Sequence, residues 1–275
     1  IAPSAERSHY MKPIELSAKE EQLLKFLLKA KYTTTKQLAR LYFTDSMSSS
    51  TALRRANLTT KKLNEKGYIR HLDRRIGGVR AGSGSFVWKI NTNGMKYLKQ
   101  KQMNLSITRQ NNYEPTWHHL EHTLAISEIY VQLTELKNKH SIQSIDSFQF
   151  EPNCWRGWLD NHAGRMILKP DCYIEISLDN YLYNYFVEVD KNSESLTRIV
   201  NKSKQYIRYF NLNIEQKDTG IFPLVLWVVP DDKRKLAITR RIQEELQDYW
   251  ELFQVIPLDD FKDVMLGGIS DGQAD

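Results

Sequence analysis

The sequence has few cysteines and no long apolar segment. Cys154 and Cys172 are the only cysteines among the 275 residues, and their spacing excludes both a disulfide scaffold and a cysteine-based zinc site. The longest apolar run, Leu224–Pro230, has the length of one strand, whereas a transmembrane helix needs about 18 residues or more. The N-terminus has no apolar core of a signal peptide. We therefore expect a soluble cytoplasmic protein with no membrane partner.

Several catalytic motifs are also missing. There is no P-loop, so ATP-driven chemistry is not supported. A nicking-joining enzyme would need a catalytic tyrosine beside a His-x-His pattern, which is absent despite 14 tyrosines. His118 and His122 lie one helical turn apart, a spacing that can bind metal, but no third ligand follows at a recognisable distance. We expect surface or pocket-lining roles for His118, His119 and His122.

Charge is distributed unevenly along the chain. Residues 1–110 hold 22 Lys and Arg against 7 Asp and Glu, and residues 111–275 hold 17 against 26. A basic half joined to an acidic half is typical of a nucleic-acid-binding region attached to a region of different chemistry. A solvated basic surface without a partner is the alternative.

Periodicity in the basic half predicts three helices, a hairpin and a further helix. Ser17 and Glu20 have the spacing of a capping box before an apolar stripe, and Gly67 follows the third helix as a C-terminal stop. The predicted helices cover residues 16–31, 36–43, 49–66 and 93–100, and the predicted strands cover residues 68–73 and 86–90.

This order of elements over residues 14–100, with the ending LNEKGYI at Leu63–Ile69, resembles a winged helix-turn-helix. In that motif the second helix enters the major groove and its N-terminal residues contact the bases. Arginine can bond two acceptors of guanine, and basic hairpin residues can contact phosphates or the minor groove. The resemblance therefore implies binding to double-stranded DNA by Ser49, Ser50, Thr51, Arg54, Arg55, Lys61 and Lys62, and by Arg74, Arg75 and Arg80 of the wing.

The acidic half follows a polar linker at residues 101–116 and covers residues 117–265. Its pattern predicts the order αβββαβαβ, which makes the whole chain an α/β (α+β) protein. The predicted helices cover residues 117–137, 194–211 and 233–252, and the strands cover residues 144–151, 169–177, 183–189, 224–230 and 254–257.

Two carboxylates lie at the ends of neighbouring predicted strands. If residues 169–177 and 183–189 pair as a hairpin, Asp171 and Glu188 come together. Paired carboxylates can hold Mg²⁺, which can activate water for attack on a phosphodiester. Asp190 would add a third negative charge, which raises the pKa values of the group unless a cation neutralises it. The pattern thus leaves open a Mg²⁺ site and a site that has lost its activity.

The order of elements over residues 117–230 resembles the PD-(D/E)xK nuclease superfamily and its restriction-endonuclease-like αβββαβ core. Pro170 and Asp171 match the "PD" positions and Glu188 matches "(D/E)", but Asp190 stands where the motif has lysine. Some members carry that lysine on the following helix, where Lys202 or Lys204 could replace it. The resemblance implies a catalytic set of Asp171, Glu188, Asp190 and Lys204, with Asp171, Glu188 and Glu128 (or Glu121) as metal ligands.

The combination of a winged helix, the helix HHLEHTLAISEIY and the pattern KPD…FVEVDKNSES…KSKQYIRYF resembles the replication-relaxation proteins of bacterial plasmids and mobile elements over most of residues 16–255. That resemblance implies work on plasmid DNA in replication or transfer, with a nuclease-like fold that binds without cleaving. Other replication or transfer proteins and a second copy of the chain are the further partners it suggests. The alternatives are a Mg²⁺-dependent endonuclease using Asp171 and Glu188, and a transcriptional regulator.

Overall fold

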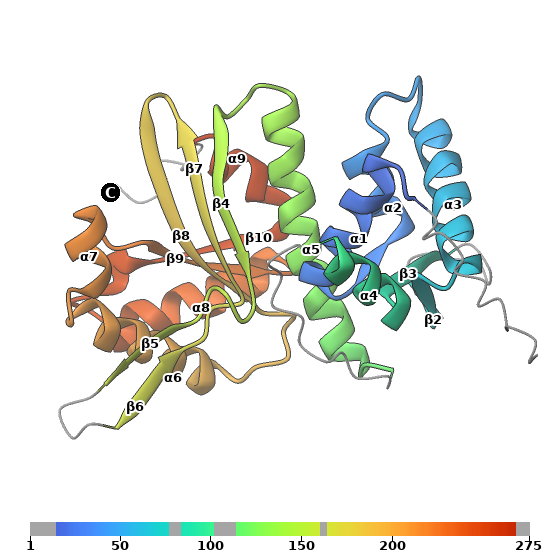
Figure 1. The fold of residues 1–275 in the computed structure, drawn as a ribbon. Coiled ribbons are helices and arrows are strands. Elements are labelled where there is room, and N and C mark those ends of the chain that lie inside the picture. Colours follow the sequence, from blue (N-terminus) through green and yellow to red (C-terminus); the bar gives the residue numbers. More distant parts are fainter. Residues whose placement is uncertain (1–14, 77–83, 102–113, 160–163, 268–275) are drawn as a thin grey trace, which may run out of the picture.

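The computed structural model describes residues 15–76, 84–101, 114–159 and 164–267. Helices and strands are mixed, as the sequence predicted, and they form two units that follow one another along the chain (Figure 1). We call residues 15–101 the N-terminal unit and residues 114–267 the C-terminal unit. None of the helices in these described ranges combines the length and apolar character that a membrane span requires.

In its described residues, 15–76 and 84–101, the N-terminal unit has four helices and a small sheet whose strand order is β1-β3-β2. Its elements are α1 (Ala18–Ala30), β1 (Thr33–Thr34), α2 (Thr35–Tyr42), α3 (Ser49–Glu65), β2 (Ile69–Ile76), β3 (Ser85–Ile90) and α4 (Thr92–Gln100). The capping box of Ser17 and Glu20 is present, and Gly67 after α3 has a φ of 71°, a left-handed conformation that glycine adopts without a steric penalty.

The C-terminal unit is built on a five-stranded sheet of order β10-β9-β8-β7-β4. Strands β4, β7 and β8 are antiparallel neighbours, while β9 and β10 run parallel to β8. Its elements are α5 (Trp117–Asn138), β4 (Ser144–Phe150), β5 (Arg156–Leu159), β6 (Arg165–Leu168), β7 (Cys172–Leu178), β8 (Tyr181–Val189), α6 (Leu196–Phe210), α7 (Ile214–Thr219), β9 (Leu224–Val229), α8 (Asp232–Glu245), β10 (Phe253–Pro257) and α9 (Phe261–Met265).

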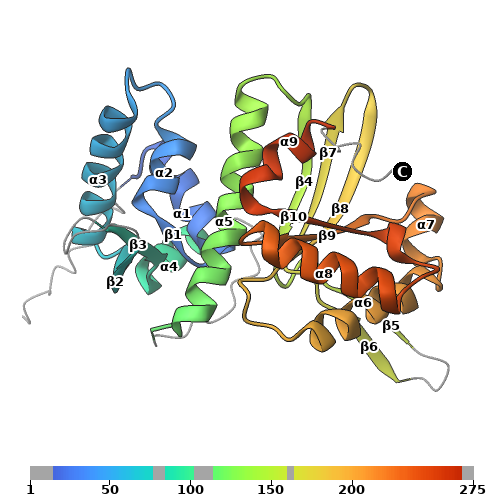
Figure 2. The same ribbon diagram turned by 180° about the vertical axis from the view of Figure 1, so that it is seen from behind.

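Helices cover both faces of this sheet (Figures 1 and 2). Because side chains alternate along a strand, Val187 and Val189 pack on one face with α5 and α9, and Phe186 packs on the other with α6 and α8. Glu188 shares the second face and is only 4% exposed. Because of this alternation, the carboxylate of Glu188 lies in the apolar layer between the sheet and α6.

The element order differs from the sequence prediction in several places. The predicted helix over residues 233–252 ends at Glu245, because buried Leu246 leaves the helix and the chain turns back towards β10. The strand predicted from Lys169 begins at Cys172. The hairpin β5–β6 and the short elements β1, α7 and α9 were missed, since runs of two to six residues give too few periods to recognise.

Helix α5 joins the two units. Phe26 of α1 stacks on Tyr130 of α5 with ring centroids 5.0 Å apart, and Phe26 also meets Phe150 of β4. The buried side chains of α1, α5 and the sheet form one continuous apolar cluster. The predicted linker at residues 101–116 lies mostly outside the described residues.

Candidate functional sites

Helix α3 is an outermost element of the N-terminal unit, on the side away from the C-terminal unit (Figures 1 and 2). Ala56, Thr60 and Leu63 bury one face of it. The opposite face is exposed and polar, and within the described residues Arg54 has no ion pair there. Its exposed residues include Ser49, Ser50, Thr51, Arg54, Asn57, Lys61 and Lys62. The predicted contact residues of α3 therefore share one accessible surface, apart from half-buried Arg55.

Arg55 is held by other side chains. Its guanidinium bonds both carboxylate oxygens of Asp45, at 2.9 and 3.1 Å, and the hydroxyl of Ser46 at 2.9 Å. It also lies over the ring of Phe43, 5.3 Å from the centroid. These bonds tie the turn before α3 to the helix, so Arg55 positions the start of α3 and is less available to a base than Arg54.

The lysines at the C-terminal end of α3 each face a carboxylate. Lys62 pairs with Glu20 at 2.8 Å, and Lys61 lies 3.9 Å from Glu65. Both lysines remain largely exposed. Of the predicted wing residues, the side chains of Arg74 and Arg75 and the whole of Arg80 lie outside the described part of the structure.

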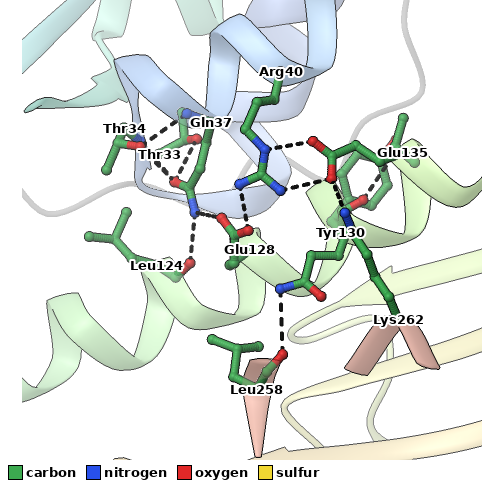
Figure 3. A network of polar contacts seen from close by, with 12 residues as sticks. Thr33, Thr34, Gln37, Arg40, Leu124, Glu128, Tyr130, Glu135, Leu258 and Lys262 are labelled. Carbon is green, nitrogen blue, oxygen red and sulfur yellow. Dashed lines mark hydrogen bonds and ion pairs between the residues drawn. The ribbon is translucent and has the colours of Figure 1, made fainter. Parts of the chain in front are cut away.

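An ionic network at the junction of the units contains Glu128, which the sequence placed among the metal ligands (Figure 3). Arg40 of α2 bonds Glu128 and Glu135 of α5, each at 2.6 Å, and Lys262 of α9 also pairs with Glu135. Gln37 donates to Glu128 at 3.1 Å. Burial opposes ionisation of Glu135, but Arg40 and Lys262 outweigh it and hold its pKa well below the usual range.

This network corrects the prediction for Glu128. Its carboxylate serves the contact between α2 and α5 and is engaged there by Arg40 and Gln37. Because α2 also packs against α3, the same contact orients the exposed surface of α3 relative to the C-terminal unit.

Asp171 and Glu188 do lie together, at the end of the β7–β8 hairpin, as the sequence predicted. The backbone N–H of Asp171 donates to Val187, and its Oδ2 accepts from the N–H of Val189 at 2.7 Å. His122 of α5 approaches from the side, with Nε2 3.2 Å from Asp171 Oδ1 and Nδ1 3.0 Å from the carbonyl of Val189. Both oxygens of Asp171 are therefore engaged within the chain.

The environment of His122 favours its protonated form. The carbonyl of Val189 faces Nδ1 and the carboxylate of Asp171 faces Nε2, so an imidazole that carries a proton on each nitrogen can donate to both. Burial lowers the pKa of His122, but the bond to Asp171 and its charge outweigh burial and raise the pKa above the usual value.

Glu188 is enclosed by two groups from α6. The hydroxyl of Tyr206 donates to Glu188 Oε1, and the ammonium of Lys202 lies 3.2 Å from the same oxygen. Lys202 also donates to the carbonyl of Lys169 at 2.7 Å. Burial and the charge of Asp171 raise the pKa of Glu188 to about 8, against the opposing effect of Lys202 and Tyr206.

Asp190 and Lys204 have other partners. Asp190 is 1% exposed and pairs with Arg234 of α8 at 2.5 Å, and its other oxygen caps the N–H groups of Ser193 and Glu194. Lys204 is exposed and lies 3.4 Å from Glu245. Of the two lysines that the sequence offered, Lys202 lies beside Glu188 and Lys204 does not, and Asp190 anchors the turn before α6.

The choice between the two lysines was readable from the sequence. Lys202 and Tyr206 are four residues apart and share one face of a helix, whereas Lys204 projects from a different side. No comparable pattern in the sequence indicated that His122 contacts Asp171 or that Arg234 contacts Asp190. His118 was paired with His122 by spacing, yet His118 is exposed and His122 contacts Asp171.

The donor set at the hairpin does not fit Mg²⁺. Magnesium requires free carboxylate oxygens and several waters, but Asp171 and Glu188 already bond Val189, His122, Lys202 and Tyr206. Among the described residues, no three His, Cys, Asp or Glu side chains are grouped so that they could hold a metal ion. We call Asp171, Glu188, His122 and Lys202 the carboxylate cluster.

A family model described as replication-relaxation matches residues 24–225 of the chain. The chain belongs to the replication-relaxation family. The comparisons with curated proteins and with solved structures give no match. Membership in the replication-relaxation family supports a role in the replication of plasmids or mobile elements.

The match to the replication-relaxation family includes α3, the junction network and the carboxylate cluster, but it ends within β9. Arg234 of α8 and Lys262 of α9 therefore lie beyond it, although they neutralise Asp190 and Glu135.

Proposed function

We propose that this replication-relaxation protein binds double-stranded DNA through the N-terminal unit, acting as a winged helix-turn-helix with α3 in the major groove. The observation that carries the proposal is the exposed polar face of α3, with Arg54 unpaired within the described residues. The strong excess of basic residues in the first 110 residues supports it, because cationic side chains release counterions from DNA when they bind phosphates.

The residues of α3 suit base recognition. Ser49, Ser50 and Thr51 form the first turn, which is the part of a recognition helix that meets base edges. Arg54 follows on the exposed face and can bond the two acceptors of guanine. Leu58 is 60% exposed one turn further along, where an apolar side chain can contact the methyl group of thymine.

The hairpin formed by β2 and β3 is the element that would act as the wing. It follows α3 directly, and the antiparallel pairing of Ile69 with Ile90 anchors it on the unit. Arg74, Arg75 and Arg80 remain predicted phosphate or minor-groove contacts of this wing.

For the C-terminal unit we propose a PD-(D/E)xK-like fold that no longer cleaves. Its element order and the juxtaposition of Asp171 with Glu188 support the resemblance. The bonds of His122 and Lys202 to these carboxylates support the loss of cleavage, since a metal would have to displace both cations. The unit then serves to carry α5 and to hold α2 and α3 in a fixed orientation.

Sequencing of DNA fragments retained by the full chain, followed by binding to the recovered sequence, tests the proposal. If about five basic side chains contact phosphates, log K should fall with log[salt] with a slope of about −4.5. Arg208→Ala removes a charge from the exposed side of α6 and should leave the slope unchanged. A salt-independent affinity would contradict DNA binding.

The same preparation decides between binding and cleavage. Supercoiled plasmid carrying the recovered sequence should remain intact with Mg²⁺ or Mn²⁺ at millimolar concentration. Neither ion should raise the unfolding temperature, because three of the four carboxylate oxygens of Asp171 and Glu188 are engaged and a ligand stabilises only the state that it binds. Cleavage that disappears in Asp171→Asn would establish the endonuclease alternative instead.

A further inference from the structure

A groove with aromatic walls lies at the junction of the two units, formed by α1, α2, α5 and β4. Its volume is about 500 Å³, within the range of small-molecule binding sites. Phe26 and Tyr130 are stacked, and Phe148 meets Tyr130 edge-on with ring centroids 4.9 Å apart. Tyr42 packs edge-on against Phe26 from the α2 side.

Some of these aromatic rings are partly exposed to solvent. Phe26 is 5% exposed, but Tyr42, Tyr130 and Phe148 are only half-buried and line the groove. The groove therefore offers aromatic surface from three elements to a molecule that enters it.

The charged residues that line the groove are mostly cations. Lys25 and Lys29 of α1 and Lys137 of α5 line it, and within the described residues none of the three has an ion pair. Among the described residues that line the groove, Asp146 is the one acid, and it accepts hydrogen bonds from the hydroxyls of Ser144 and Ser177. The groove is thus a positively charged site partly supplied by a unit whose sequence is acidic overall.

Aromatic rings beside lysines have the chemistry that binds unpaired nucleotides. A base that is not paired can stack on an aromatic side chain, and its phosphates can meet the ammonium groups. A duplex cannot use the rings, because its bases are stacked on one another, and an apolar ligand would leave three lysines unused. The size of the groove suits one or two nucleotides.

We propose that this groove binds a single-stranded segment of DNA, with bases against Tyr42, Tyr130 and Phe148 and phosphates at Lys25, Lys29 and Lys137. The proposal extends the proposed DNA-binding function from duplex to single strand and to that extent rests on it. The site is built from different residues than the exposed face of α3, so the two activities can be lost separately.

Fluorescence anisotropy of the full chain with a labelled oligothymidylate of about 12 nucleotides tests the site. The double variant Lys25→Ala/Lys29→Ala should bind it more weakly, and its salt slope should be shallower by about 1.4, or about 0.7 for each lost phosphate contact. The control Lys96→Ala/Lys99→Ala removes the same charge from exposed α4 and should bind as wild type. Equal loss in both double variants would overturn the proposal.

Contact with the rings has its own measurement. On irradiation, an oligothymidylate that carries 5-iododeoxyuridine should crosslink to Tyr42, Tyr130 or Phe148 of the wild-type chain. Mass spectrometry identifies the crosslinked residue. Phe148→Leu should lower the affinity about fivefold or more, as loss of a stacking ring does. Crosslinks confined to α3 would contradict the site even if Phe148→Leu proved unstable.

Arg54→Ala separates this inference from the proposed function. It should weaken binding to duplex and leave the affinity for oligothymidylate unchanged. If the wild-type chain binds duplex but not oligothymidylate, the single-strand site fails alone. If it binds oligothymidylate in the groove but no duplex, recognition by α3 fails alone.

Discussion

Charged side chains of α3 and of the carboxylate cluster differ in what they contact. Arg54 on α3 is exposed and has no ion pair within the described residues, whereas Asp171 and Glu188 each bond a cation of the chain itself. An exposed unpaired charge costs the fold little and remains available to a ligand. A buried carboxylate must be compensated within the protein, as at Asp171, or keep its proton, as the raised pKa of Glu188 indicates, because desolvation penalises the charge heavily. The comparison distinguishes charged side chains that are available to bind a partner from charged side chains that stabilise the fold.

The largest effect should come from the buried ion pair of Asp190 and Arg234. Like Asp171, Asp190 is a carboxylate whose charge is balanced by a cation of the same chain. Arg234→Met leaves the carboxylate of Asp190 buried without its cation, and breaking such a pair costs about 3–5 kcal/mol of unfolding free energy. Urea unfolding followed by circular dichroism measures the change. Arg208→Ala, on the exposed side of α6, should stay within about 0.5 kcal/mol of wild type.

The double variant Asp190→Asn/Arg234→Met tests the reason for that loss. It removes both charges and should recover part of the stability. If the double variant were as unstable as Arg234→Met plus a further loss for Asp190→Asn, compensation of charge would not explain the cost.

An intermediate effect should come from the two arginines of α3. Arg54→Ala should weaken binding to the preferred duplex by about 1–3 kcal/mol and relax the preference at one base position, with the stability unchanged. Arg55→Ala should also weaken binding, but it should lower the unfolding temperature because the turn at Asp45 and Ser46 loses its ties. Binding titrations and thermal unfolding of both variants measure this contrast. Equal changes in stability would remove the distinction between contact and positioning.

The most gradual effect, with the smallest change between neighbouring conditions, should be a pH dependence of stability due to Glu188. Burial raises its pKa from 4.5 to about 8, so the folded chain retains a proton that the unfolded chain releases. The stabilising contribution is therefore complete below about pH 4.5 and is lost as the pH rises through about 8. The slope for one proton is at most about 1.4 kcal/mol per pH unit.

Urea unfolding of wild type and Glu188→Gln between these pH values isolates that contribution. His122 also has a raised pKa, so its own contribution falls as the pH rises and is common to both proteins. The wild-type curve should descend more steeply than that of Glu188→Gln. Parallel curves would show that Glu188 is ionised throughout.

Local signals in the sequence accounted for most of the first unit. The capping residue Ser17, the apolar spacing of α3 and the stop at Gly67 are determined within a few residues, so helix boundaries came within about two positions. The exposed face of α3 followed from the same periodicity. Arg55 is held away from that face by its bonds to Asp45. Asp45 lies in a turn, and the spacing of apolar residues does not predict the course of a turn.

The meeting of Asp171 and Glu188 was also accessible to the sequence, because it needs only one hairpin between neighbouring strands. The side chains that surround this pair could not be predicted from the sequence. His122, Lys202 and Arg234 come from three different helices, and each arrives through the packing of that helix on a face of the sheet. Glu128 was predicted for the same site but lies on the side of α5 that meets Arg40.

By itself, the sequence determined most of the longer helices and strands, the separation of basic from acidic halves and the pair of carboxylates at the end of a hairpin. These depend on side-chain periods and near neighbours, whose physics is local. The tertiary structure alone decided which charges are free and which are compensated. That outcome depends on burial and on partners up to 127 residues away, as for Glu135 and Lys262, and both arise only when the helices pack.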